Sequence, residues 1–360
     1  MSNDNDHPAA GSPPEDLWDR DHDTSNQDET DQAAVSSQRD LPPVEAPSAA
    51  FLLQLFLIPM IIVAIMVTVW FMFSWLAHLG SDPRELVRNL GSLNKASWQN
   101  ALTLANLLRD AEHDALKDDE ELAGDLIRLL DKQLELGSLD PTRIQLRVYL
   151  CHCLGEFRLQ TTIPTLLKAA SLERDMAEVE VRVAALQSLA IMAQNVGPAV
   201  VRKNDSLVEG LLTISQLRED NSNLRSRNEI RSAAAYALGR IGGARSLDRL
   251  AQMTSDSYPN SRFNAATGLA RHGDPRAVGV LLEMLDADNP GVVAGELTAE
   301  ARATKRSWVI DNGIRATGLF VRHGTGEGLE QLQAALERIR TSNQPMAMKL
   351  KAKKVLLEIP

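Results

Sequence analysis

The chain has 360 residues, a formal net charge of −10 and only two cysteines. Residues 1–50 hold twelve of the 48 acidic and two of the 38 basic residues, so the rest of the chain has 36 of each and is neutral. A neutral body lacks the clustered basic surface of a nucleic-acid-binding protein. Two cysteines do not make a disulfide framework, and an aromatic content of 4% is unusual for an all-β protein.

The first segment, residues 1–50, is rich in Asp, Ser, Pro, Gln and Asn and has no hydrophobic periodicity. Such a segment buries too little apolar surface to offset the loss of chain entropy on folding. We therefore predict a disordered acidic tail.

Residues 51–79 contain no Asp, Glu, Lys or Arg. A helix of this length extends about 43 Å at 1.5 Å per residue, more than the ~30 Å of a bilayer's hydrocarbon core. Trp70 and Trp75 lie near its C-terminal end, where indole rings act as anchors at the membrane interface. A signal peptide fits less well, because the segment begins after fifty residues and lacks a basic n-region. We predict a single transmembrane helix in contact with the lipid bilayer.

The basic residues that flank this span indicate its orientation. Arg39 precedes it, and Arg84, Arg88 and Lys95 follow it. Under the positive-inside rule, this bias places the C-terminal part of the chain in the cytoplasm. Cys151 and Cys153 are two residues apart on a predicted helix, so their side chains point apart. We expect free thiols, which suit a reducing compartment.

After a predicted linker and N-terminal helical cap at 80–139, one helical pattern recurs in residues 140–343. Residues at offsets 0, 3, 4, 7, 8 and 11 are apolar or small, and the pattern starts at Leu146, Val181, Ile230, Ser261 and Ile310. The fourth copy is weaker. A second apolar helix follows each copy, and two longer spacings indicate polar insertions near 218–228 and 287–304. Residues 344–360 are predicted to form a C-terminal cap helix.

Two consecutive copies carry a family resemblance: IRSAAAYALGRIGGARSLDRLAQM and SRFNAATGLARHGDPRAVGVLLEML. They resemble HEAT repeats of the short bacterial type found in phycobilin-lyase-like proteins, and the resemblance covers roughly residues 140–340. It implies an all-α fold, a right-handed α-solenoid of HEAT-like helix pairs. In such arrays each unit buries its apolar face against its neighbours.

Two groups of basic residues are candidate binding residues. Offset 1 is arginine in four copies: Arg147, Arg182, Arg231 and Arg262. These arginines either pair with acidic residues of adjacent repeats, as in similar HEAT arrays, or line the concave surface and bind an acidic peptide of a partner or a lipid headgroup. The last predicted helix carries Lys349, Lys351, Lys353 and Lys354, which are either solvated or in contact with lipid headgroups.

Enzyme motifs are missing from the sequence. There is no Gly-x-Ser-x-Gly, Walker-type or Cys-x-x-Cys motif, and no His-Glu dipeptide of the kind that binds iron in one class of HEAT-repeat enzymes. His272 and His323 precede Gly273 and Gly324, so we expect them at helix C-termini with the glycines as left-handed caps. We assign no catalytic, cofactor-binding or metal-binding residue and expect no enzyme activity.

The function predicted from these features is a membrane-anchored scaffold that binds a protein partner, which the sequence does not identify. Two alternatives stay open. One is a HEAT-like, lyase-type enzyme or enzyme subunit. The other is a structural membrane protein that self-associates as a homo-oligomer through its span, where Ala64 and Thr68 form a small-xxx-small pair.

Overall fold

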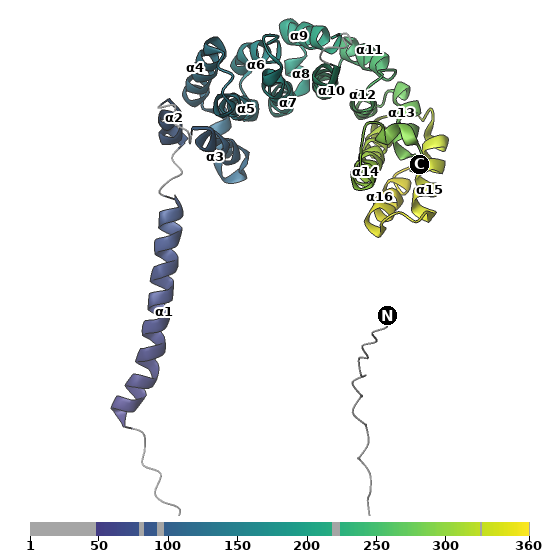
Figure 1. Ribbon diagram of the computed structural model, residues 1–360. Helices are drawn as coiled ribbons and strands as arrows, with labels where there is room; N and C mark the ends of the chain where they lie inside the picture. Colours follow the sequence, from purple (N-terminus) through teal and green to yellow (C-terminus); the bar gives the residue numbers. More distant parts are fainter. Residues whose placement is uncertain (1–47, 79–82, 92–96, 218–223, 325, 360) are drawn as a thin grey trace, which may run out of the picture. The chain divides into compact units, whose positions relative to one another are not determined.

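A computed structural model describes residues 48–78, 83–91, 97–217, 224–324 and 326–359 (Figure 1). None of these residues forms a β-strand. The predicted acidic tail lies outside the described residues as far as residue 47. The chain divides at Trp70, within its first helix, into two units, which are described separately.

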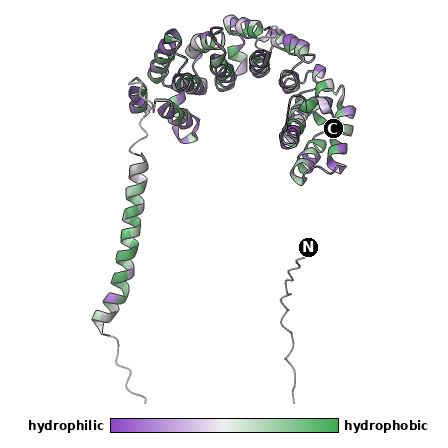
Figure 2. Ribbon diagram, viewed as in Figure 1, coloured by the Kyte–Doolittle hydropathy of each residue, from purple (hydrophilic) through white to green (hydrophobic). Residues whose placement is uncertain are grey.

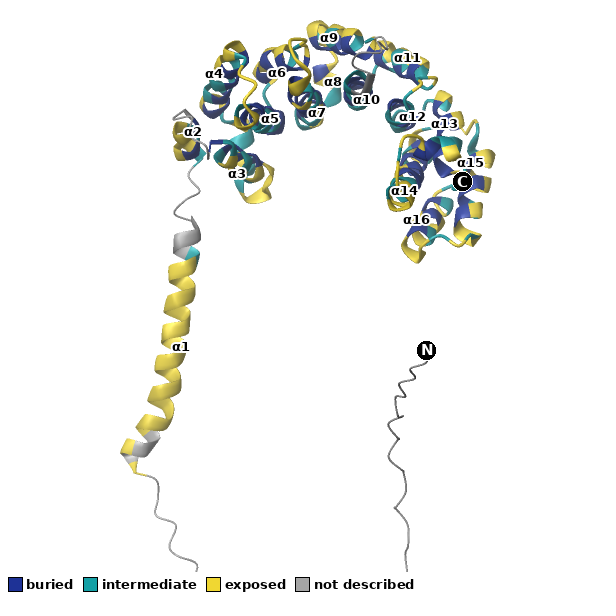
Figure 3. Cartoon of the chain, in the orientation of Figure 1, coloured by how far each residue is buried: buried dark blue, intermediate teal, exposed yellow. Residues whose placement is uncertain are grey.

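Helix α1 (Ala49–His78) begins within the segment predicted to be disordered and contains Pro59. Its window Leu53–Ser74 is 22 residues long with a mean hydropathy of 2.7, and none of it is buried against other parts of the described chain. Figure 2 shows that it is largely hydrophobic and Figure 3 that it is exposed along its described length. Among the described residues, one helix is thus long and apolar enough to cross a membrane.

The second unit continues with helices joined by short turns. The α-helices are α2 (Pro83–Gly91), α3 (Ser97–Arg109), α4 (Glu120–Leu136), α5 (Pro141–Glu156), α6 (Ile163–Ala170), α7 (Val179–Val196), α8 (Pro198–Val201), α9 (Asp205–Ser215), α10 (Leu224–Ile241), α11 (Ala244–Met253), α12 (Pro259–Arg271), α13 (Val278–Leu285), α14 (Ala299–His323), α15 (Leu329–Thr341) and α16 (Met346–Leu356). Short 3₁₀ helices are η1 (Ala111–Asp118), η2 (Gln160–Thr162), η3 (Met176–Glu178), η4 (Pro275–Ala277) and η5 (Pro290–Val293).

These helices stack in two layers. The first helices of the pairs, α3, α5, α7, α10, α12 and α14, each contact the next in the series. The second helices, α4, α6, α9, α11 and α13, each pack against the first helix that follows, for example α6 against α7 and α11 against α12. One continuous hydrophobic core fills the space between the layers, from Leu86 to Val355. The arrangement is that of an α-solenoid, in which each pair is buried by its neighbours.

The repeated offsets correspond to this core. Leu150, Val181 and Leu238 are fully buried, as expected for a stripe that repeats every three or four residues. Helix α3 contacts α5, and α4 contacts both α5 and α6. The stacking therefore extends N-terminal of residue 140, where we predicted the repeats to start.

Local sequence signals set the helix ends. Asp140 Oδ1 accepts hydrogen bonds from the backbone N–H groups of Thr142 (2.9 Å) and Arg143 (3.3 Å), and Pro141 occupies the first turn of α5. An acidic N-cap and a proline at the first position both favour helix initiation. Gly137 ends α4 in the left-handed conformation with φ 60°.

Two details differ from the sequence-based expectations. Gly273 has the expected positive φ of 68°, but Gly324 caps α14 in an extended conformation with φ −84°. Part of the polar insertion predicted at 287–304 is helical, because α14 begins at Ala299, where Thr298 Oγ1 accepts a hydrogen bond from the Ala301 N–H. Helix α14 is therefore 25 residues long and extends beyond the repeat pattern that starts at Ile310.

Helix α16 packs against α14 and α15 at the C-terminal end of the stack. Met348, Ala352 and Val355 face this contact and are buried, while Lys353 and Lys354 are exposed. Lys351 forms an ion pair with Asp311 of α14 at 2.5 Å. This helix occupies the position expected of a C-terminal cap.

Candidate partner-binding groove

The arginines at offset 1 form ion pairs within the chain. The guanidinium of Arg147 is fully buried, pairs with the buried carboxylate of Glu178 and donates to the Ser138 carbonyl at 2.6 Å. Glu178 lies in η3, directly before α7, so the pair joins two successive helix pairs. Arg174 also contacts Glu178, at 2.6 Å.

Arg231 and Arg262 each form a bidentate contact with one carboxylate. Arg231 donates to both carboxylate oxygens of Asp256, at 2.9 and 3.0 Å. Arg262 donates to both oxygens of Glu283, at 3.3 and 2.5 Å. The planar guanidinium matches a carboxylate in this geometry, which fixes the orientation of both side chains.

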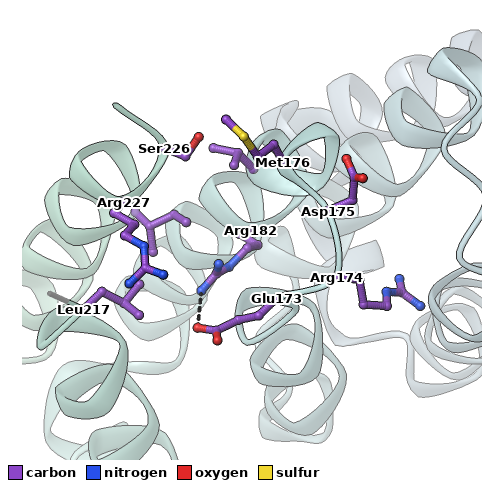
Figure 4. Close-up of a pocket in the computed structure, with 10 residues that line it drawn as sticks. Glu173, Arg174, Asp175, Met176, Arg182, Leu217, Ser226 and Arg227 are labelled. Atoms are coloured by element: carbon purple, nitrogen blue, oxygen red, sulfur yellow. Dashed lines mark hydrogen bonds and ion pairs between the residues drawn. The ribbon is translucent and has the colours of Figure 1, made fainter. Parts of the chain in front are cut away.

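Arg182 has the weakest carboxylate contact of the four. It donates to the Ala170 carbonyl at 3.0 Å and reaches Glu173, which is 62% exposed, at 3.5 Å (Figure 4). Burial lowers the pKa of Arg182, and the nearby charge of Arg227 contributes in the same direction. All four arginines thus have partners within the chain, and their contact with another protein stays a prediction.

The other predicted contact residues lie elsewhere. Trp70 is 65% exposed on α1, and the side chain of Trp75 is outside the described residues. Lys353 and Lys354 are exposed on α16, whereas Lys349 is half-buried and Lys351 is paired with Asp311. Contact of these side chains with lipid stays a prediction.

A groove crosses the exposed side of the first helices. Its two parts have volumes of about 560 and 640 Å³ and share Ser232, Tyr258, Asn260 and Asn264, so they are continuous. The first part extends to Arg109 of α3 and His152 of α5, and the second extends to Trp308 of α14. We call this surface the first-helix groove. In Figure 1 the first helices lie along the inner side of the curved stack.

The groove is lined by positions that recur in the repeat pattern. Offset 2 is Val183, Ser232, Phe263 and Asn312, and offset 6 is His152, Gln187 and Tyr236. These two offsets differ by four residues and therefore lie on one side of a helix. Offset 1 lies about 100° around the helix from offset 2. The arginines and the groove are thus on different sides of the first helices, which sequence reasoning did not distinguish.

Aromatic side chains concentrate at this surface. Tyr236 and Tyr258 line the groove, and Tyr149, the third tyrosine of the chain, packs against His152 at a ring-centroid distance of 6.2 Å. Trp98 stacks on Tyr149 at 6.0 Å. Trp308 is 68% exposed. Tyr and Trp are enriched in protein–protein interfaces, because they bury a large apolar area and keep a polar group.

Hydrogen bonds and ion pairs fix the walls of the groove. Asn264 donates to the carbonyl and hydroxyl oxygens of Ser232 at 2.9 and 3.0 Å. Arg109 pairs with Glu156 at 2.8 Å, and Lys305 with Glu296 at 3.0 Å. Because these contacts bridge neighbouring helices or adjoining segments, the groove is preformed, which lowers the entropy lost on binding.

The titratable groups next to the groove include one histidine and two cysteines with shifted pKa values. Burial, assisted by the charge of Arg109, lowers the pKa of His152, so its imidazole is neutral at pH 7. Cys151 and Cys153 are free and buried, as expected. Burial raises the pKa of the Cys151 thiol to about 12 and also raises that of Cys153, so neither supplies a thiolate. Within the described ranges, no group of three or more His, Cys, Asp or Glu side chains is arranged to hold a metal ion.

The family comparison agrees with this architecture. The model for HEAT repeats matches residues 214–301, from the end of α9 to the start of α14. Residues 214–301 are therefore similar to HEAT repeats. The match includes α10 and α11 and also α12 and α13, whose sequences carried the resemblance described above. No curated protein matches the chain.

The segment that resembles HEAT repeats provides the centre of the first-helix groove. Tyr236 lies on α10 and Phe263 on α12, both within the matched segment, while Trp308 lies just beyond it on α14. The neighbouring pairs α5/α6 and α7/α9 continue the same two-layer stacking outside the match.

Proposed function

We propose that the protein is a membrane-anchored scaffold whose first-helix groove binds a protein partner. HEAT repeats commonly mediate interactions between proteins. The observation that carries the proposal is the concentration of aromatic side chains along one preformed groove, including the exposed Trp308. Stacked helical repeats supply extended surfaces of this kind. Binding without catalysis is part of the proposal.

Replacing Trp308 with alanine is expected to weaken binding of the partner by about 30-fold, the size of a central hot-spot contact of ~2 kcal/mol. The folded array should be unaffected, since the side chain is 68% exposed. The measurement is the amount of partner that co-purifies with full-length protein from detergent-solubilised membranes, at a series of salt concentrations.

Met346→Ala is the matched control, because Met346 is 69% exposed on α16 and lies outside the groove. This variant should retain the partner. Equal retention by Trp308→Ala and Met346→Ala would argue against the groove as the binding surface.

The anchoring part of the proposal rests on α1. Its 22-residue apolar window exceeds the ~20 residues needed to cross the hydrocarbon core. In the proposed orientation, Arg84, Arg88 and Lys95 are cytoplasmic, together with the HEAT repeats. The right-handed sense of the solenoid and its likeness to the short bacterial repeat type are finer parts of the same proposal.

Topology reporters fused after residues 45 and 90 test this orientation. We expect the fusion at 45 to report export and the fusion at 90 to report a cytoplasmic location, because three basic residues follow the span and one precedes it. An exported signal from the fusion at 90 would reverse the orientation. Identical signals from both fusions would argue against a single crossing.

A further inference from the structure

Two further arginines of the repeats do not belong to the ion-paired arginines at offset 1. Arg240 of α10 and Arg271 of α12 are at offset 10 of successive repeats, near the C-terminal ends of these helices. Arg240 lies 5.3 Å from the centroid of the Tyr236 ring and donates to the Gln194 side-chain oxygen at 2.7 Å. Because Tyr236 lines the first-helix groove, Arg240 lies at its edge. Arg271 is on the neighbouring helix α12, whose Gly268 lies against Gly239 of α10.

The described residues do not neutralise either arginine. Within the described residues, no carboxylate lies at ion-pair distance from Arg240 or Arg271, in contrast to Arg231 and Arg262. Arg271 is half-buried, and its Nε is shielded from water and has no hydrogen-bond partner there. Burial lowers the pKa of Arg271, and the nearby charge of Arg240 contributes in the same direction.

An adjacent pair of partly desolvated, unneutralised cations is unfavourable unless an anion completes it. A guanidinium binds a carboxylate through two parallel hydrogen bonds, which are stronger than those between neutral groups. The wall beyond Arg240 is aromatic, and the far part of the groove is lined by Glu296 and Glu300. This charge distribution favours a ligand with a discrete acidic group beside an apolar one and opposes a continuous polyanion.

We propose that Arg240 and Arg271 bind an acidic side chain of the partner, while a neighbouring aromatic or aliphatic side chain of the same peptide segment occupies the first-helix groove. This inference rests on the proposed function, and it specifies the chemical class of the partner segment: an acidic residue next to an apolar anchor.

The test is a selection from a random peptide display library on full-length protein in nanodiscs. Peptides selected on the unmodified protein should be enriched in Asp or Glu near Trp, Phe or Leu. A selected peptide should bind the double variant Arg240→Gln/Arg271→Gln about tenfold or more weakly, since hydrogen bonds to charged groups contribute ~1.5–3 kcal/mol. Binding is measured by fluorescence anisotropy.

Arg245→Gln/Arg276→Gln is the matched control. It removes the same charge from the second-helix side, where Arg245 pairs with Glu209 and Arg276 with Asp248. We expect less than a twofold change in peptide affinity. Thermal unfolding of each variant, followed by circular dichroism, shows whether the fold is retained.

The outcomes separate the two proposals. Peptides without acidic enrichment, or with equal affinity for the protein and for Arg240→Gln/Arg271→Gln, would overturn the inference and leave the groove proposal standing. If the protein selects no peptides, or if selection is insensitive to Trp308→Ala, the proposed function fails and the inference fails with it.

Discussion

Glu178→Ala is expected to destabilise the helical array by about 3–5 kcal/mol, the range measured when one partner of a buried ion pair is removed. Arg147 and Glu178 are both 0% exposed, so the substitution leaves the Arg147 charge buried without a counter-ion. It also removes a partner of Arg174. Urea denaturation of the full chain measures the effect, with hydrogen exchange in α5 and α7 to locate it, because repeat arrays unfold in parts.

Two further variants test whether the unpaired, buried charge of Arg147 causes the loss of stability. Arg147→Met/Glu178→Leu removes both charges and should recover much of the loss, since apolar replacements of a buried pair are often tolerated. Glu283→Ala should cost less than Glu178→Ala, because the side chains of Arg262 and Glu283 are 18% and 20% exposed. A loss below about 1 kcal/mol for Glu178→Ala, typical of an exposed pair, would contradict the structure at this position.

Gly268→Ala is expected to destabilise the array by about 1–3 kcal/mol through overpacking. A Cβ atom at position 268 would lie 2.7 Å from the Cα of Gly239 and 2.9 Å from a methyl group of Leu250. Gly239 belongs to α10 and Gly268 to α12, so these two glycines let the helix backbones approach closely. The shift in the midpoint of urea-induced unfolding measures the change in the free energy of unfolding.

Gly279→Ala is the same substitution in a helix with free space. A Cβ atom at Gly279 of α13 meets nothing within 4 Å. Because alanine favours the helix over glycine by about 1 kcal/mol, this variant should be neutral or more stable. If Gly268→Ala and Gly279→Ala changed the stability equally, the close approach of the α10 and α12 backbones would not explain the glycine at position 268.

The helices could be predicted from the sequence because apolar residues recur at the same offsets in every copy of the repeat. Leu150, Leu189 and Leu238 are apolar at the same face of three successive copies, and all are fully buried. Periodicity identifies such a face without knowledge of the neighbours. It is less informative at segment ends, where α14 extends to Ala299 through residues that lack the repeat pattern.

The residues that line the groove were not predicted, because a repeat pattern identifies the buried side of a helix but not which exposed side faces the other first helices. Arg182 and Gln187 are both polar on α7, yet Arg182 is buried beside a turn and Gln187 lines the groove. A usable signal was present. Tyr236 and His152 share offset 6, and aromatic residues are rare elsewhere in the array.

In the proposed function, a partner protein occupies the first-helix groove while this chain is anchored in its membrane. A photo-crosslinking amino acid at position 308, in native membranes, tests it most directly, with position 206 on the second-helix side as the control. Trp308 lines the groove, and Ser206 is exposed on α9. We predict a discrete protein adduct at 308 and none at 206. Equal adducts at both positions, or no protein adduct at 308, would show that the groove is not the binding surface.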